Sequence, residues 1–375
     1  MHTVAIDDPA LETLMLPFER GLLPWPQTGG ALFLRARDGA PLHRQPLPGM
    51  VCEQGFKPDA DALTRSGLTL AGPDDTTRYP LVLVLPPRQR EEARALYARA
   101  VERVAPGGRV VACVNNNDGA RSAQDDLRKL TGAVADLTKN KCRVFWTAPL
   151  HVDDGAASLD TALLTQWGQL DAPRPVAGGR FTSRPGVFAW DRIDPASALL
   201  VSQLPKDLAG VAADLGAGFG YLSAELLARC PGITALDLYE AEARALELAR
   251  INMDRLSTTA ALAYHWHDVT AGLPKQYDVI ISNPPFHTQG SAYRPDIGRR
   301  FIAVAAEALK PGGRLWLVAN RHLPYEAVLT GSFGSVRTVA QDDGFKIIEA
   351  IKAVPARPEP KPRPFNRGEL KRSIR

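Results

Sequence analysis

Asp214-Leu215-Gly216-Ala217-Gly218-Phe219-Gly220 is the stretch that decides the fold. It closes an apolar segment that begins at residue 211 and is typical of a buried strand, and it precedes a helical pattern over residues 221–229. A strand that turns through glycines into a helix predicts an α/β sheet, with the loop at the ligand-binding edge. The spacing is Gly-x-Gly-x-Gly, unlike the Gly-x-Gly-x-x-Gly of pyrophosphate-binding folds. It therefore favours S-adenosylmethionine over NAD, although such a loop can also be a purely structural turn.

Carboxylates follow the next two predicted strands. The strand over residues 233–239 ends at Glu240, and a carboxylate there can accept both hydroxyls of a ribose. An acid in the first turn of a helix is also favoured by the helix dipole, but that alternative does not explain the preceding glycine loop. Asp268 follows the strand over residues 262–266 and is placed to accept from an adenine amino group. Both carboxylates are predicted to contact the cofactor.

The fourth predicted strand, residues 277–282, runs into Asn283-Pro284-Pro285-Phe286. A planar exocyclic amine is a poor nucleophile because its lone pair is delocalised into the ring. The side-chain oxygen of Asn283 and the carbonyl of Pro284 can accept the two N–H hydrogens and favour pyramidalisation. The prolines restrict the loop, and Phe286 supplies a face on which a base can stack. Placed after a strand and downstream of the glycine loop, the motif indicates amine methylation without a metal or a covalent intermediate.

Parallel segments recur in the two halves of the chain. Tyr-Pro-Leu-Val-Leu-Val-Leu-Pro-Pro at 79–87 parallels Tyr-Asp-Val-Ile-Ile-Ser-Asn-Pro-Pro at 277–285, and Pro-Gly-Gly-Arg occurs at both 106–109 and 311–314. The repetition predicts one α/β unit used twice. Leu85 stands where the second copy has Asn283, and no Gly-x-Gly loop follows the first strand of the first copy. The first unit is therefore predicted to be degenerate and kept for structure or for holding a large substrate.

Length and composition narrow the class of protein. A chain of 375 residues is long enough for two domains, and no apolar run approaches the ~20 residues of a membrane span. The start of the chain lacks the pattern of an export signal, so a cytoplasmic location is expected. Four scattered cysteines indicate no disulfide framework, and His265 and His267 lack a third metal ligand.

The positive charge is concentrated at one end of the chain. The net charge is +4, but the Pro-rich residues 355–375 alone hold seven Lys or Arg against two Glu. The rest of the chain is close to neutral and is not expected to bind polyanions in general. Two interpretations of the tail remain open, since it can contact a nucleic acid or only be a solvated extension.

Taken together, segments of the second half resemble one family. They are Asp214-Leu-Gly-Ala-Gly-Phe-Gly220, residues 240–252, Ile280-Ile-Ser-Asn-Pro-Pro-Phe-His287, Pro311-Gly-Gly, Val318-Ala-Asn-Arg-His-Leu-Pro-Tyr325 and Gly344-Phe-Lys. They look like the ribosomal RNA guanine-N2 methyltransferases of the small-subunit type and the closely related large-subunit type. The resemblance covers residues 185–353, including Pro185-Gly-Val-Phe188, and that family also carries a degenerate N-terminal domain. The first 75 residues and the tail depart from the pattern.

The resemblance implies roles for individual residues. The positions expected to hold S-adenosylmethionine are Asp214, Gly216, Ala217, Gly218, Glu240, Asp268 and Asn283. Those expected to act on the target base are Asn283, Pro284 and Phe286. No metal ion is expected in the site.

We therefore expect two tandem Rossmann-like methyltransferase domains. Residues 1–170 form the degenerate domain, residues 176–354 form the catalytic domain with a seven-stranded sheet ending in an antiparallel hairpin, and residues 355–375 form the tail. The expected reaction is methylation of a guanine N2 amine in 16S rRNA, with ribosomal RNA or a ribosomal subunit as partner. The alternatives are 23S rRNA, an adenine N6 amine, a protein glutamine, or a non-catalytic RNA-binding assembly factor.

Overall fold

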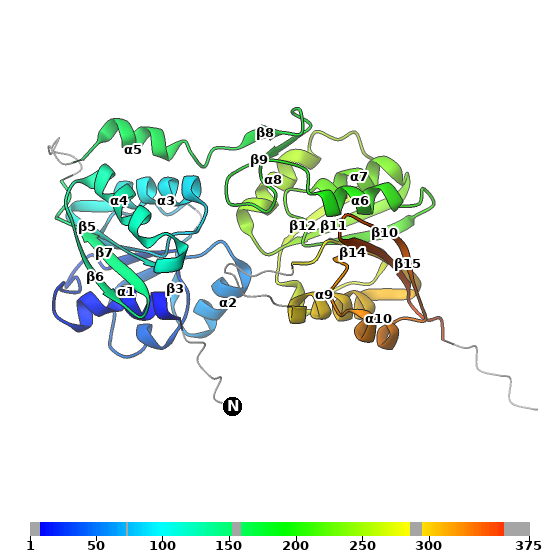
Figure 1. The fold of residues 1–375 in the computed structure, drawn as a ribbon, viewed down its shortest axis with the longest axis horizontal. Coiled ribbons are helices and arrows are strands. Elements are labelled where there is room, and N and C mark those ends of the chain that lie inside the picture. The colour runs from blue at the N-terminus through cyan, green and yellow to red at the C-terminus, as the bar shows by residue number, and fades with distance from the viewer. Residues whose placement is uncertain (1–7, 73, 152–158, 286–294, 356–375) are drawn as a thin grey trace, which may run out of the picture.

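The computed structural model describes residues 8–72, 74–151, 159–285 and 295–355, which form two sheets side by side, each flanked by helices (Figure 1). Their strand orders are β3-β2-β1-β4-β5-β7-β6 and β12-β11-β10-β13-β14-β16-β15. These are one topology used twice, because each strand of the first sheet has a counterpart at the same place in the second. The predicted fold of two tandem Rossmann-like units is confirmed.

The first sheet lies among helices on both faces (Figure 1). Its strands are β1 (Ala31–Leu34), β2 (Met50–Glu53), β3 (Thr69–Leu70), β4 (Tyr79–Val84), β5 (Val104–Asn115), β6 (Val134–Lys139) and β7 (Cys142–Thr147). The accompanying helices are α1 (Pro9–Glu19), η1 (Ala40–Leu42), α2 (Lys57–Arg65), α3 (Arg90–Glu102), η2 (Asn116–Asp118), α4 (Ala120–Thr131) and α5 (Thr161–Gly168).

The second sheet repeats this plan. Its strands are β10 (Ala209–Leu215), β11 (Gly232–Glu240), β12 (Ala261–Trp266), β13 (Tyr277–Ser282), β14 (Leu309–Asn320), β15 (Ser335–Asp342) and β16 (Phe345–Ile351). The accompanying helices are α6 (Pro195–Gln203), α7 (Tyr221–Arg229), α8 (Ala243–Met253), η3 (Val269–Ala271), α9 (Pro295–Ala308) and α10 (Glu326–Ser332). Strands β10 to β14 pair in parallel and β16 is antiparallel to both β14 and β15, as the predicted hairpin requires.

The repeated sequence segments occupy equivalent places. Tyr79 and Tyr277 begin β4 and β13, and the two Pro-Gly-Gly-Arg segments lie inside β5 and β14. Each segment is an irregularity within a longer strand, where the register with the neighbouring strand shifts. Strands β5 and β14 have the same pattern of buried and exposed positions, which indicates that burial preserves the fold in both copies.

The described residues 159–183, between the two large sheets, contain regular structure despite their prolines. Of the polar run 153–160, residues 153–158 lie outside the described residues, and Asp160 caps α5, which packs on α3. Within the proline-bearing run 171–175, Arg174 begins β8 (Arg174–Val176), which pairs with β9 (Phe181–Ser183). Among the helices described, none is long and apolar enough to cross a membrane.

The two halves join through corresponding loops. The amide of Lys57, which begins α2, donates to the carbonyl of Ala241 at 2.8 Å, and the amide of Ala243, which begins α8, donates to the carbonyl of Gly55 at 2.9 Å. Because Gly55 and Lys57 follow β2 as Ala241 and Ala243 follow β11, the contact has the reciprocity of a two-fold interface.

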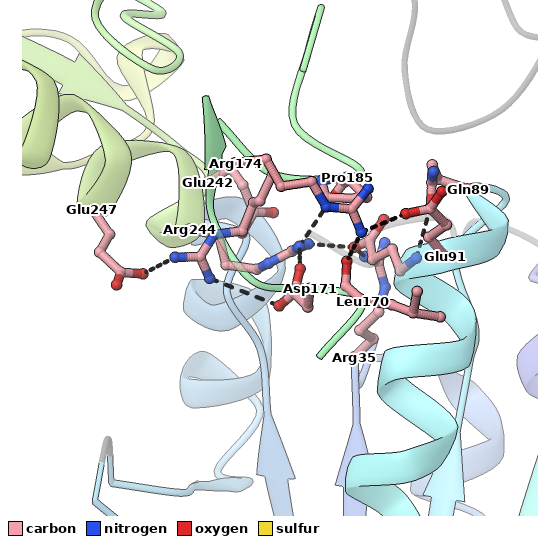
Figure 2. A network of polar contacts seen from close by, with 12 residues as sticks. Arg35, Gln89, Glu91, Leu170, Asp171, Arg174, Pro185, Glu242, Arg244 and Glu247 are labelled. Carbon is pink, nitrogen blue, oxygen red and sulfur yellow. Dashed lines mark hydrogen bonds and ion pairs between the residues drawn. The ribbon is translucent and has the colours of Figure 1, made fainter. Parts of the chain in front are cut away.

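A polar network reinforces this junction (Figure 2). Arg244 of α8 forms ion pairs with Glu92 of α3 and with Asp171, and it donates to the carbonyl of Pro185 at 2.9 Å. Glu92 is 8% exposed and also accepts from Arg35, which follows β1, at 2.8 Å. One buried carboxylate is thus shared by arginines from both halves.

Candidate active site

The glycine loop lies between β10 and α7 at the carboxyl edge of the second sheet. Gly216, Gly218 and Gly220 have φ angles of +77°, +56° and +89°. Residues that carry a Cβ rarely adopt this left-handed backbone region, so the conformation of the loop requires glycine. At Gly218 no other protein atom lies within 4 Å of where a Cβ would be, so the space beside the loop is open. The requirement is therefore conformational here, and no crowding within the protein contributes to it.

Asp214 lies beneath this loop, at the end of β10. Its side chain is 0% exposed, and its Oδ2 accepts from the Ser223 hydroxyl at 2.7 Å. Its Oδ1 has no hydrogen-bond partner among the described residues. Burial is the main cause that raises the pKa of Asp214 to about 7, and the nearby charge of Glu240 adds to the rise. An unpaired buried carboxylate oxygen is costly and leaves one acceptor for a ligand or water.

Glu240 ends β11 and is tied to the glycine loop. Its Oε2 accepts from the amide of Gly218 and its Oε1 from the amide of Glu242, both at 2.8 Å. Each oxygen keeps a further acceptor position that a ribose hydroxyl can use. Burial raises the pKa of the Glu240 carboxyl. The helical pattern predicted from residue 240 begins at Ala243, because Glu242 serves as the N-cap of α8.

Asn283 reaches the same edge from β13. Leu215 pairs with Ser282 in the register of β10 and β13, and the Ser282 hydroxyl donates to the Leu215 carbonyl at 2.7 Å. This pairing brings Asn283 beside the glycine loop. Pro284 is buried, and Phe286 lies outside the described residues, so its predicted stacking role is not described.

One pocket collects several of the predicted residues. Its lining is Phe188, Ala189, Asp194, Ser197, Gly216, Ala217, Gly218, Phe219, Tyr221, Leu222 and Asn283. Phe188 is 62% exposed. Among the described residues, the lining includes neither Asp214, Glu240 nor Asp268. Asp268 caps η3 by accepting from the amide of Thr270 at 2.9 Å, so its carboxylate has a structural function beside the predicted cofactor contact.

Among the pocket residues that sequence reasoning missed are the two that form hydrogen bonds with the side chain of Asn283. Asp194 is the N-cap of α6, and Ser197 follows in the first turn of that helix. The side-chain nitrogen of Asn283 donates to Asp194 Oδ2 and to Ser197 Oγ, both at 2.9 Å. The available signal was the helix start Asp194-Pro195-x-Ser197, an N-cap followed by a proline. That signal predicts a helix boundary but not the contact with a residue 89 positions away.

The arrangement fits S-adenosylmethionine. The open space beside Gly218, the unpaired oxygen of Asp214 and the remaining acceptor positions of Glu240 suit a ligand with an ammonium group and ribose hydroxyls. Among the described residues there is no cluster of three or more His, Cys, Asp or Glu side chains that could hold a metal ion.

The duplicated sheet and the glycine-lined pocket define a Rossmann-like methyltransferase, and a family model described as the methyltransferase small domain matches residues 178–349. Ribosomal RNA small subunit methyltransferase C of Pseudomonas aeruginosa (strain LESB58) is 34% identical over 279 residues, covering 71% of this chain and 77% of that protein. The enzyme of the same name from Shewanella pealeana is 30% identical over 276 residues, covering 73% and 78%. The chain belongs to the ribosomal RNA small subunit methyltransferase C family.

A solved structure shares the whole architecture. The T. thermophilus 16S rRNA N2 G1207 methyltransferase in complex with AdoMet and guanosine matches with a TM-score of 0.73 and 24% identity, covering 94% of each chain. At this identity the likeness concerns the fold, and it extends over both halves.

Proposed function

We propose that this chain transfers the methyl group of S-adenosylmethionine to the exocyclic N2 amine of a guanine in 16S rRNA. The observation that carries the proposal is the meeting of Asn283 with the loop Gly216–Gly218 in one pocket at the carboxyl edge of a methyltransferase sheet. The similarity to ribosomal RNA small subunit methyltransferases C supports a small-subunit RNA, and the similarity to a 16S rRNA N2 G1207 methyltransferase supports guanine N2 as the methylated position.

In this proposal the cofactor supplies a sulfonium methyl group, which is already activated for transfer. Asp214, Gly216, Ala217, Gly218, Glu240 and Asp268 hold and orient it, and Asn283, which is expected to contact the cofactor as well, acts mainly on the target amine. Asn283 Oδ1 and the Pro284 carbonyl accept the N–H hydrogens of the target amine and favour pyramidalisation. The nitrogen lone pair forms the new N–C bond, the C–S bonding pair remains on sulfur, and the extra proton leaves to water. Positioning and electrostatics supply most of the rate.

We propose that the first half serves structure and RNA binding, with the limits 1–170, 176–354 and 355–375 for the two domains and the tail. The packing of α5 on α3 supports including residues up to 170 with the first half, and the pairing of β8 with β9 supports a second domain that begins near residue 176. Residues 356–375 lie outside the described residues, so contact of the basic tail with RNA stays a prediction.

The test is methylation of separately purified, unmodified 30S and 50S subunits with labelled S-adenosylmethionine, followed by nucleoside analysis. Label in N2-methylguanosine of 16S rRNA is expected. Label only in 23S rRNA would transfer the proposal to the large subunit, and N6-methyladenosine or methylglutamine as the sole product would overturn it. An absence of cofactor binding would support the non-catalytic alternative instead.

A further inference from the structure

The amide of Asn283 has only one favourable orientation in the pocket. One side of it faces the Asp194 carboxylate and the Ser197 hydroxyl, each 2.9 Å away. A carboxylate only accepts hydrogen bonds, so the amide nitrogen must face Asp194. If the amide turned by 180°, its oxygen would face a carboxylate oxygen, and the hydrogen bond to Asp194 would become a repulsive contact, whereas the Ser197 hydroxyl can donate to either orientation. The side-chain oxygen of Asn283 is thereby directed away from Asp194.

The two acceptors are held by a well-anchored helix start. Asp194 Oδ2 also accepts from the Ser197 amide at 2.8 Å, which closes the first turn of α6. Pro195 at the next position has the φ that a helix start requires. Ser197 and its neighbour Ala196 are buried, and α6 packs on β14 and β16. The acceptors are thus positioned by the second sheet itself.

The first half shows which part of this arrangement is structural. Helix α1 also begins with an Asp-Pro pair, Asp8-Pro9, and the Asp8 side chain also caps its helix. In that half Leu11 stands where Ser197 stands in the second, and Leu85 stands where Asn283 stands. Asp8 instead forms an ion pair with Arg37 at 2.9 Å. The cap is common to both copies, whereas the contact with an amide occurs in the copy that carries the pocket.

We propose that Asp194 and Ser197 are positioning residues that fix the Asn283 amide with Oδ1 toward the target amine. The inference rests on the proposed function, in which Oδ1 accepts a hydrogen from that amine. A reversed amide would present N–H donors to an amine that also donates, and the productive geometry would be lost. Asp194 therefore affects the reaction through Asn283, and its replacement should change the affinity for S-adenosylmethionine only slightly.

The test uses variants of the full chain that preserve the helix start. Asp194→Ser keeps an efficient N-cap but is one bond shorter and does not reach Asn283. Ser197→Ala removes only the second acceptor. Asp194→Asn is the conservative control, because its amide oxygen can accept the same hydrogen bonds without the charge. For each variant, kcat and KM with 30S subunits, the Kd for S-adenosylmethionine and Tm are measured.

Loss of a hydrogen bond to a charged group predicts a fall in kcat of about 10- to 100-fold for Asp194→Ser, with a smaller fall for Ser197→Ala. Asp194→Asn should recover most of the turnover. The cofactor Kd and Tm should stay close to wild-type values. In an Asn283→Ala background, Asp194→Ser should lower kcat no further, because the residue through which it acts is already absent.

Two results would overturn the inference. One is a cofactor affinity that falls in proportion to kcat, which would make Asp194 a ligand of the cofactor. The other is an equal loss of kcat from Asp194→Ser with and without Asn283. Failure of the proposed function is seen separately, in wild-type protein that forms no N2-methylguanosine.

Discussion

The two halves of the chain share one sheet topology but differ in the residues that follow the equivalent strands β1 and β10. After β10 the second half has Gly216-Ala217-Gly218, whereas after β1 the first half has Arg35-Ala36-Arg37. Arg37 pairs with Asp8, the counterpart of Asp194, and Arg35 pairs with Glu92 at the junction of the halves. Charged side chains of the first half thus interact where the second half keeps a pocket.

The comparison separates what maintains the fold from what makes the site. Strands β4 and β13 are largely buried in both copies, and β5 and β14 share one burial pattern. Their apolar cores are sufficient to keep the topology. Catalytic chemistry depends on a few strand-end residues, which can be replaced without loss of the sheet. The first half also contacts the second beside the end of β11, through the hydrogen bonds made by the amides of Lys57 and Ala243.

The largest effect is expected from replacing Asn283, whose equivalent in the first half is the apolar Leu85. Asn283→Ala should lower kcat by about 10²- to 10³-fold, because it removes an acceptor that acts in the transition state. The Kd for S-adenosylmethionine should change little, since the glycine loop and Glu240 are intact. Single-turnover methylation and calorimetric titration measure the two quantities.

A conservative Leu85→Met variant in the first half is the control, and it should keep both values near wild type. An Asn283→Ala enzyme with normal turnover would remove the role assigned to the amide.

The junction of the halves should give the next largest effect. Arg244→Met leaves the buried Glu92 carboxylate and Asp171 without this guanidinium, and it should destabilise the protein by about 3 kcal/mol, as breaking a mostly buried ion pair does. Adding Glu92→Gln should recover part of the loss. Urea unfolding monitored by circular dichroism provides the measurement.

Arg180→Met is the matched control at a surface pair. Arg180 pairs with Glu225 but its side chain is 65% exposed, so the change should cost at most about 1 kcal/mol. Equal losses from the two arginine variants would show that the junction contributes no more than the surface.

Many of the features that distinguish the two halves could be predicted from the sequence, because each is encoded in a short continuous segment. The glycine loop, the strand end at Glu240 and the Asn-Pro-Pro motif are each read within a few residues, and the repeated segments revealed the duplication. The strand over 277–282 was placed at its observed limits. Hydrophobic patterning and turn residues suffice for such features.

Contacts between distant segments could not be predicted in this way. The Asp194–Asn283 hydrogen bond and the sharing of Glu92 by Arg35 and Arg244 depend on how helices pack around the sheets. A capping aspartate or a surface arginine occurs in most proteins, so the residue type alone does not identify its partner. The dual use of Glu240, with each oxygen accepting a backbone amide, is likewise visible only in three dimensions.

A smaller effect tests the left-handed loop against a glycine of the first half that also has a positive φ angle but lies in a strand. Gly218→Val places a β-branched residue at φ +56° beside the cofactor and should weaken S-adenosylmethionine binding at least about tenfold. Gly107→Val imposes similar strain at φ +79°, in a position equally free of neighbours but in β5. Gly107→Val should lower Tm by about as much as Gly218→Val does, and it should leave the cofactor Kd unchanged. Comparable Kd changes in both variants would mean that general destabilisation, not the loop, controls binding.

A pH-dependent effect is expected from Asp214, the buried carboxylate beneath the loop, which forms no ion pair among the described residues. The pKa of Asp214 in the folded protein is raised to about 7, so the folded state binds a proton that the unfolded state releases near pH 4. Its contribution to stability is therefore full at low pH and is lost as pH rises from about 4 to about 7. Asp214→Asn, neutral throughout, should become more stable relative to wild type by about 1 kcal/mol per pH unit between pH 5 and 7.

Urea midpoints of both proteins at several pH values measure this difference, with Asp207→Asn as the exposed control. The side chain of Asp207 is 75% exposed, so its replacement should leave the pH profile parallel to that of wild type. A parallel profile for Asp214→Asn as well would mean that Asp214 is ionised in the folded protein. Its buried oxygen would then need a partner beyond Ser223, and saturating S-adenosylmethionine should shift the profile if the cofactor's ammonium group is that partner.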